Sequence, residues 1–327
     1  MESLGVGQQE GVIGELSKVT WAVGGGKGGV GKSLVAISLA YWLGRLKRRA
    51  ILMDGDLGGA NLHTMLGMRI PQKNLDDFIL KRVDTLDDIL LPTSMQGVQL
   101  LAGGSEVPAL ANPNFAQKSR ILRAMQNLET DVLLVDLGAG TSLNTLDLFL
   151  ACPRKLVVMT PQPTSIQNAY GFVKAAFYRR ITRALRRTQL KGLFDVSANS
   201  DEPIPQSVEE VLEEVSIGAP EALDEVRAAI DDLRLELVVN MARDPKEHKV
   251  GDLIREVCKK FLGLDVRVRG TIPYDPGMEK WAKTMDAGAL GQDTGSSALR
   301  AAYEIAYEMI SELEATPTSE QSFRRAA

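Results

Sequence analysis

The sequence predicts an α/β fold, in which a mostly parallel, twisted sheet carries helices on both faces. Short apolar segments typical of buried parallel strands occur at residues 19–23, 50–53, 131–135, 155–159, 235–239 and 266–271. Helical patterns separate them at residues 33–47, at 117–128, from about 165 onward, and at 296–314. A glycine-rich loop joins the first of these strands to the first helix. Alternation of this kind places helices on both faces of a parallel sheet.

The composition is that of a globular protein. A chain of 327 residues can bury a large core within one α/β domain. Its hydrophobic fraction of 44% and charged fraction of 24% argue against wholesale disorder. The formal net charge of −4 disfavours a generally basic nucleic-acid binder, although it leaves a local basic patch open.

Cysteine and histidine usage argues against a structural metal site. Cys152 and Cys258 form no Cys-x-x-Cys pair, and His63 and His248 lack metal-ligand spacing. The N-terminus lacks the basic and apolar regions of a signal peptide, and no apolar run reaches about 18 residues. We therefore expect a cytoplasmic protein without a transmembrane segment, in a reducing compartment.

The chain divides into three parts by composition. Residues 1–17 are polar and glycine-rich and are expected to form a flexible arm, and residues 316–327 a flexible tail. Residues 18–315 are expected to form one domain. Within it, the acidic segment at about 192–234 is interpreted as a helical insertion rather than as an independent domain.

A phosphate-binding loop follows the first predicted strand. Its residues, which fit the pattern G-x-x-x-x-G-K-[ST], are Gly26, Lys27, Gly28, Gly29, Val30, Gly31, Lys32 and Ser33. Glycines let backbone N–H groups approach phosphate oxygens, and the following helix adds its positive N-terminal end. We expect Lys32 to reach the β- and γ-phosphates and Ser33 to ligate Mg²⁺. The alternative is a glycine-rich turn that binds no ligand.

An extra lysine early in this loop, Lys27, resembles the signature lysine of the MinD/ParA class of P-loop ATPases. In that class the lysine reaches across a nucleotide-bound dimer to the phosphates on the other subunit. The resemblance implies that Lys27 supplies transition-state charge, as an arginine finger does, and that dimerisation depends on ATP. The alternative is an ordinary solvated loop lysine.

Two further segments resemble the switches of this class. The segment from Asp54 to Asn61 resembles the first switch, which implies that Asp56 orients the attacking water and that Asp54 lies near Mg²⁺. The segment from Asp136 to Gly140 resembles the Walker B strand end and the second switch. It implies that Asp136 holds Mg²⁺ through water and that the Gly138 N–H senses the γ-phosphate. As alternatives, Asp56 could cap a helix and Asp136 could simply end a strand.

The base site is expected from two distant segments. Asn240 resembles the adenine-reading asparagine of the class, and Pro273, Tyr274 and Asp275 resemble the loop that closes over the base. A plain role at a strand end remains the alternative for Asn240.

The amino-acid sequences of these motifs most resemble those of the flagellar-number regulators of the FleN or FlhG type, over about residues 19–180 and 235–310. This resemblance implies a homodimer that forms with ATP and Mg²⁺, hydrolyses ATP slowly, and is stimulated by a protein partner. It implies control over the number or placement of a cellular structure, flagella above all. Contact with the inner face of the cell membrane or with DNA is left open.

Rival functions within and outside the class differ in what they require. A partition ATPase would share the same core and bind DNA through a basic surface. An iron–sulfur carrier would need paired cysteines, and a metabolic kinase would need an acceptor site. A non-hydrolysing relative would be expected to lose Lys32 or Asp56, yet both are present.

One basic segment offers a candidate anion-binding surface. If residues 179–191 are helical, then at 100° per residue one face gathers Arg179, Arg180, Arg183, Arg186 and Arg187. Such a face could dock DNA, acidic lipid or an acidic partner. The alternatives are a solvated face or a face neutralised by the acidic insertion.

Overall fold

The computed structural model describes residues 19–104, 112–188, 190, 205–284 and 295–315. The predicted arm at 1–17, the tail at 316–327 and residues 192–204 of the acidic segment lie outside the described residues.

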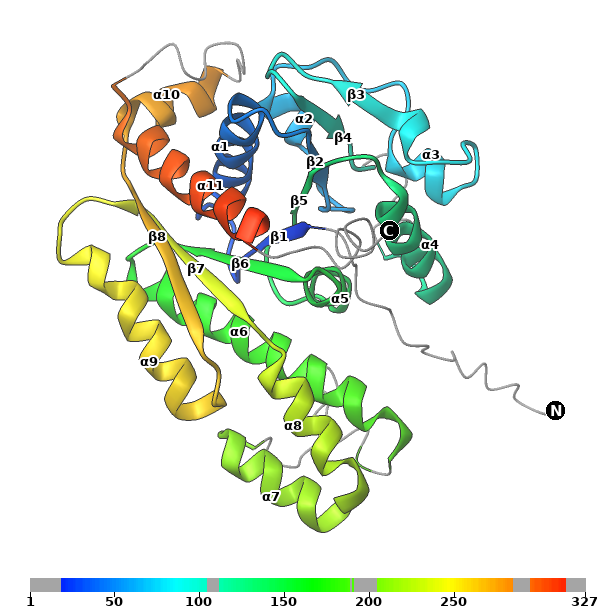
Figure 1. Cartoon of the computed structure of the whole chain (residues 1–327), viewed down its shortest axis with the longest axis vertical. Helices are drawn as coiled ribbons and strands as arrows, with labels where there is room; N and C mark the ends of the chain where they lie inside the picture. The colour runs from blue at the N-terminus through cyan, green and yellow to red at the C-terminus, as the bar shows by residue number, and fades with distance from the viewer. Residues whose placement is uncertain (1–18, 105–111, 189, 191–204, 285–294, 316–327) are drawn as a thin grey trace, which may run out of the picture.

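A twisted eight-stranded sheet forms the centre of the molecule (Figure 1). Its strands, in sheet order, are β3 (Leu90–Pro92), β4 (Val98–Leu101), β2 (Ala50–Asp54), β5 (Val132–Asp136), β1 (Thr20–Gly24), β6 (Arg154–Met159), β7 (Leu235–Ala242) and β8 (Val266–Pro273). Neighbouring strands are parallel except for the antiparallel pair of β3 and β4 at one edge. The predicted mostly parallel sheet is confirmed.

Helices cover both faces of this sheet. On one face lie α1 (Lys32–Arg45), α2 (Leu62–Met65), α10 (Pro276–Thr284) and α11 (Ser297–Ala315). On the other lie α3 (Leu75–Ile79), α4 (Phe115–Asn127), α5 (Leu143–Ala151), α6 (Pro163–Ala184), α7 (Val208–Gly218), α8 (Leu223–Asp231) and α9 (Val250–Leu262). Alternate strand residues supply the two cores, because successive side chains in a strand point to opposite faces. Trp21 and Val23 of β1 enter one core, and Ala22 enters the other.

Side-chain caps explain where several helices begin. Asn114 accepts a hydrogen bond from the Gln117 N–H at 3.0 Å, and Gln117 Oε1 accepts one from the Asn114 N–H at 2.8 Å. This reciprocal capping box satisfies two backbone donors that would otherwise lack partners at the start of α4. Ser142 similarly caps α5 by accepting from the Thr145 N–H at 3.2 Å.

Two short strands, β3 at the sheet edge and β4 beside it, are not predicted from the sequence. Each is only three or four residues long, and Pro92 ends the first of them. Segments this short do not show a strand period, so only tertiary pairing identifies them.

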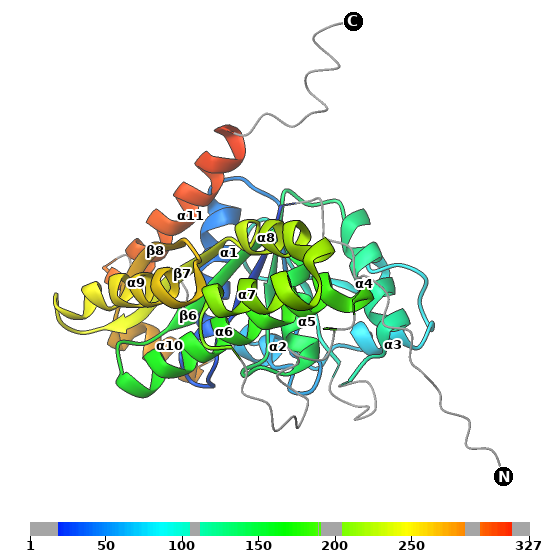
Figure 2. The same ribbon diagram turned by 90° about the horizontal axis from the view of Figure 1, so that it is seen from below.

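The described part of the acidic segment packs against the body of the domain. Helix α8 packs along α6, and α7 packs against α8 (Figure 2). Val211, Val215 and Val226 are fully buried within the core that α6 also covers. The Tyr178 hydroxyl donates to the carbonyl of Pro205, which ties the entry to this segment to α6.

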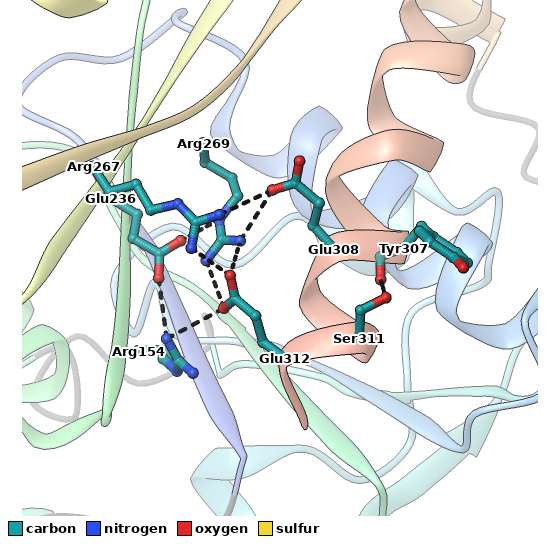
Figure 3. A network of polar contacts seen from close by, with 8 residues as sticks. All are labelled: Arg154, Glu236, Arg267, Arg269, Tyr307, Glu308, Ser311 and Glu312. Carbon is teal, nitrogen blue, oxygen red and sulfur yellow. Dashed lines mark hydrogen bonds and ion pairs between the residues drawn. The ribbon is translucent and has the colours of Figure 1, made fainter. Parts of the chain in front are cut away.

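A charge network fastens the C-terminal half of α11 to the sheet (Figure 3). Three arginines and three glutamates alternate in it, and they are Arg154, Arg267, Arg269, Glu236, Glu308 and Glu312. The Arg269 side chain is completely buried, and its guanidinium donates to Glu236 and Glu312. The other end of α11 reaches the pocket described below, where Ala298 forms part of the wall.

Candidate functional site

The phosphate-binding loop connects β1 to α1 and uses its glycines in distinct ways. Gly29 and Gly31 have φ values of 79° and 86°, in the left-handed region that favours glycine. At Gly26 a Cβ would lie 2.0 Å from the backbone oxygen of Asn168 on α6, so any side chain there would collide with fixed backbone. The fourteen-residue helix α1 begins directly after Gly31. Loop and helix therefore form the strand–loop–helix setting that the motif requires.

The two lysines of the loop differ in exposure. Lys32 is buried, and its ammonium lies 3.3 Å from the backbone oxygen of Lys27. Burial lowers the pKa of Lys32, while the nearby carboxyl groups of Asp136 and Asp56 act to raise it. The Lys27 side chain is exposed, and no hydrogen bond or ion pair ties it to any residue that the structure describes. One lysine thus faces the loop interior, and the other is free to meet a second molecule.

Two buried carboxyl groups lie side by side at the ends of adjacent strands. Asp54 of β2 and Asp136 of β5 are paired in register. Asp54 accepts backbone hydrogen bonds from Asp56, Asn61 and Leu62 at 2.8–3.2 Å. Burial raises the pKa of Asp54 to about 6, and these backbone hydrogen bonds oppose the rise.

Asp136 is less well satisfied than Asp54. Burial raises the pKa of Asp136 to about 7, while a hydrogen bond from the Ser33 side chain acts to lower it. Its Oδ1 atom is buried and has no hydrogen-bond partner in the described part of the chain. An unpartnered carboxylate oxygen beside a hydroxyl is the donor set that Mg²⁺ accepts, with waters completing its shell.

The two predicted switch segments touch each other. A Cβ at Gly138 would lie 2.9 Å from Cγ of Asp56, so the Asp56 carboxyl group packs directly on that glycine. The Gly55 N–H donates to the Asp136 carbonyl at 2.7 Å, and the Gly140 N–H donates to the Gly25 carbonyl at 3.2 Å. Backbone hydrogen bonds therefore link the first switch, the second switch and the phosphate loop.

A pocket of about 330 Å³ opens beside the loop, and all four predicted base-site residues line it. They are Asn240, Pro273, Tyr274 and Asp275. Side chains of α1 and α10 complete the wall, among them Leu34, Val35 and Met278. The pocket is mostly apolar with a few polar groups, as expected of a site for a flat ring.

Asn240 also makes a contact that the sequence did not reveal. Its amide Nδ2 donates to the backbone oxygen of Val30 within the phosphate loop at 2.9 Å. The next residue, Met241, has a φ of 59° and occupies a bulge between β7 and β8. Its side chain also lines the pocket. Neither Met241 nor Asn168 was anticipated, because a contact across more than a hundred residues leaves no local pattern.

The predicted arginine face requires a correction. Arg179 and Arg183 of α6 both bind the buried carboxylate of Asp147 on α5, at 2.9 Å and 2.7 Å. Arg180 donates to the Ala229 carbonyl at 2.7 Å and contacts Asp232 at 3.7 Å. Arg179, Arg180 and Arg183 are therefore paired within the domain, Arg180 with the acidic segment, whereas Arg187 is exposed. The helical spacing holds for Arg179, Arg180 and Arg183, but α6 ends at Ala184, and Arg186 and Arg187 lie in a 3-10 turn after it. The sequence also did not show that Asp147 lies beneath this face.

Two features are absent from the residues that the structure describes. These residues contain no group of three or more His, Cys, Asp or Glu side chains placed to hold a metal ion. They also contain no helix both long and apolar enough to cross a bilayer.

The chain is similar to known P-loop NTPases. Residues 17–178 match the family model described as "ParA: NUBPL iron-transfer P-loop NTPase". The antiactivator FleN of Pseudomonas aeruginosa is 36% identical over 262 residues, which cover 79% of this chain and 75% of FleN. The flagellum site-determining protein YlxH of Helicobacter pylori is 31% identical over 160 residues, 47% of this chain and 52% of that protein.

The fold is also shared with a solved structure. The septum site-determining protein MinD from Pyrococcus horikoshii OT3, complexed with Mg-ADP, superposes with a TM-score of 0.56 at 18% identity. The match covers 89% of this chain and 95% of that one, and it shows that the two proteins share a fold. Together with the likeness to FleN over most of both chains, these findings show that the chain belongs to the MinD/ParA family of P-loop ATPases, on the branch that contains FleN.

Proposed function

We propose that the protein is an ATP-driven dimerising switch that regulates the number or placement of flagella. The main observation in support of a switch is that Lys32 is buried and Lys27 is exposed in the same phosphate loop. The flagellar role rests on the similarity to FleN and YlxH, whose names describe an antiactivator and a flagellum site-determining protein.

In this proposal the backbone amides of the loop from Gly26 to Ser33, together with the Lys32 ammonium, bind the phosphates of ATP. The Ser33 hydroxyl and Asp136 would hold Mg²⁺, with Asp54 behind them fixing the first switch through its three backbone contacts. Bound Mg²⁺ supplies positive charge that neutralises the phosphates and stabilises the developing charge of the transition state. The base would occupy the pocket formed by Asn240 and residues 273–275.

Hydrolysis is assigned to Asp56 and Lys27. Asp56 orients the attacking water, and its contact with Gly138 couples that role to a glycine N–H that senses the γ-phosphate. Lys27, exposed and without an ion-pair partner among the described residues, would place its ammonium on the phosphates of a partner subunit. Hydrolysis would then be slow in the monomer and faster in a dimer bound to an activating protein.

Two rival roles lack support in the observed geometry. A partition ATPase would bind DNA through the arginine face, but Arg179 and Arg183 form ion pairs with Asp147. An iron–sulfur carrier needs accessible thiolates, yet Cys152 and Cys258 are fully buried, and burial raises the pKa of each thiol to about 12. We place the switch in the cytoplasm, where ATP is available, with any membrane contact peripheral.

The proposal is tested in two stages. Isothermal titration with Mg·ATP should give a saturable heat for the wild type and none for Lys32→Ala, which removes a phosphate-binding ammonium. Cells that lack the protein should then carry an altered number or placement of flagella, and the Lys32→Ala protein should fail to restore it. Normal flagellation in the absence of the protein would contradict the flagellar role without affecting nucleotide binding.

A further inference from the structure

Asn240 lies between the pocket and the phosphate loop and contacts both. Its residue is only 4% exposed, and it forms part of the pocket wall. Its amide Nδ2 donates to Val30 at 2.9 Å. The loop is tightly fitted around this amide, since a Cβ at Gly31 would come within 2.3 Å of the same nitrogen. Gly31 is thus required to be glycine both by its φ of 86° and by the presence of Asn240.

The contact fixes the orientation of one peptide group of the loop. A trans peptide places its C=O and N–H on opposite sides. When Asn240 holds the Val30 carbonyl, the N–H of Gly31 in the same peptide must point away from Asn240. Inward-facing N–H groups are what a phosphate loop offers to its ligand. The Asn240 side chain therefore restricts the peptide flip that would turn a carbonyl toward the phosphates.

A bulge at Met241 makes this double contact feasible. Side chains at successive strand positions normally point to opposite faces of a sheet. Here Asn240 pairs with Ile272 and Ala242 with Pro273, so Met241 is left unpaired, and its φ is 59°. As a result, the side chains of both Asn240 and Met241 line the same pocket. The Met241 Cε atom also lies 3.2 Å from the Cβ position of Gly31. Strained backbone of this kind is retained mainly where surrounding contacts enforce it.

We propose that Asn240 is a positioning residue for the phosphate loop, and that it links occupation of the base pocket to the arrangement of the loop amides. This inference rests on the proposed function and adds a second role to the reading of the base. Its Nδ2 is engaged by the loop, and no described residue donates to its Oδ1, which is therefore available to accept a hydrogen bond from a base amino group. A base that engages Oδ1 fixes the amide plane and with it the carbonyl of Val30.

The test uses a ligand that has phosphates but no base. Binding of Mg·tripolyphosphate and Mg·ATP is measured by calorimetry for the wild type, Asn240→Ala and Asn240→Asp. If Asn240 orders the loop, both variants lose affinity for tripolyphosphate by about 10-fold, the size expected when a buried acceptor loses its donor. Asn240→Asp retains an acceptor for the base but replaces the donor to Val30, so its loss for tripolyphosphate should be at least as large.

Tyr274→Ala is the matched control, because Tyr274 lines the pocket and contacts Arg243 and Glu279 rather than the loop. It should weaken Mg·ATP and leave tripolyphosphate unaffected. Hydrogen exchange of ligand-free protein gives a second readout: the peptide spanning residues 25–34 should exchange faster in Asn240→Ala than in Tyr274→Ala. Melting temperatures confirm that each variant is folded.

Unchanged tripolyphosphate affinity or unchanged exchange in Asn240→Ala would overturn the inference while the proposed function stands. A wild-type protein that binds neither ligand would instead overturn the proposed function itself.

Discussion

The carboxyl group of Asp56 rests directly on Gly138, so that a Cβ at position 138 would lie 2.9 Å from Asp56 Cγ. The two residues belong to the two predicted switch segments, one after β2 and the other after β5. Their contact means that a displacement of one segment is transmitted to the other by close packing, without an intervening side chain.

Gly138→Ala should therefore uncouple the switches. The added methyl would push the Asp56 carboxyl aside, and we expect hydrolysis at saturating ATP to fall by at least about 10-fold, as for misplaced catalytic groups. Phosphate release measures this effect. The control is Gly171→Ala on α6, where a Cβ would meet nothing within 4 Å. Equal rates for both variants would show that the contact has no functional role.

Lys27→Ala should abolish dimerisation with ATP and leave nucleotide binding nearly intact. The Lys27 side chain is exposed and has no ion-pair partner among the described residues, so its loss does not disturb the monomer fold. Sedimentation with Mg·ATP detects dimerisation, and fluorescence titration detects binding. Lys259→Ala, which removes another exposed lysine side chain, on α9, should behave as wild type. If the Lys27 variant sediments as a dimer with ATP, the role of Lys27 between subunits is refuted.

Asp147→Asn should destabilise the protein in a pH-dependent manner. Burial pushes the pKa of Asp147 upward, but the charges of Arg183 and Arg179 bring it below its ordinary value of 3.8. A carboxyl group whose pKa is lower in the folded than in the unfolded protein stabilises the fold at any pH above its unfolded pKa. This stabilisation is lost as the pH falls through the pKa of the folded state. We expect a loss of about 3 kcal/mol at about pH 7, because Lys118, Arg179 and Arg183 all lose a buried partner.

Urea unfolding of wild type and Asp147→Asn across pH measures the difference. It should shrink at acidic pH, below about 4, where the unfolded carboxyl is already protonated. Asp131→Asn, which removes a half-exposed partner of Arg49, should cost under about 1 kcal/mol. A loss for Asp147→Asn that does not vary with pH would argue against the ion-pair account.

The charge network on α11 should depend chiefly on its buried member. Arg269→Leu leaves Glu236 buried without its main partner, and we expect a cost of about 3–5 kcal/mol. Arg267→Ala removes a side chain that is 54% exposed and should cost under about 1 kcal/mol. Chemical denaturation compares the two. In the double variant Arg269→Leu with Glu236→Leu, most of the lost stability should return, since no buried charge remains unpaired. Similar costs for both single variants would contradict this ranking.

Local patterns were sufficient to predict much of the fold. The strand at β1, the loop and α1 are adjacent in sequence, and their glycine spacing and apolar period are local properties. Boundaries shifted by a few residues: β7 continues to Ala242 beyond the expected end at 239, because a bulge lets pairing with β8 resume after Met241.

What sequence reasoning missed was long-range pairing. Asp147 beneath the arginine face, Asn168 against Gly26, and Asn240 on Val30 each join segments that lie far apart in the chain. The predicted site residues Asn240 and 273–275 could be gathered only through resemblance to a family, since nothing in their own spacing places them beside the loop. The charge pattern showed a cluster of arginines, but neither the end of α6 at Ala184 nor the buried Asp147 carboxylate that pairs with Arg183 could be found from it.

The most direct test of the central claim is the molar mass of the purified protein by light scattering, measured with Mg·ATP and again with Mg·ADP. A switch whose Lys27 completes the site of a partner subunit predicts a mass twice that of the 35.5 kDa chain with ATP and a return to the single-chain mass with ADP. A mass that is the same with both nucleotides, while calorimetry shows that both bind, would contradict it.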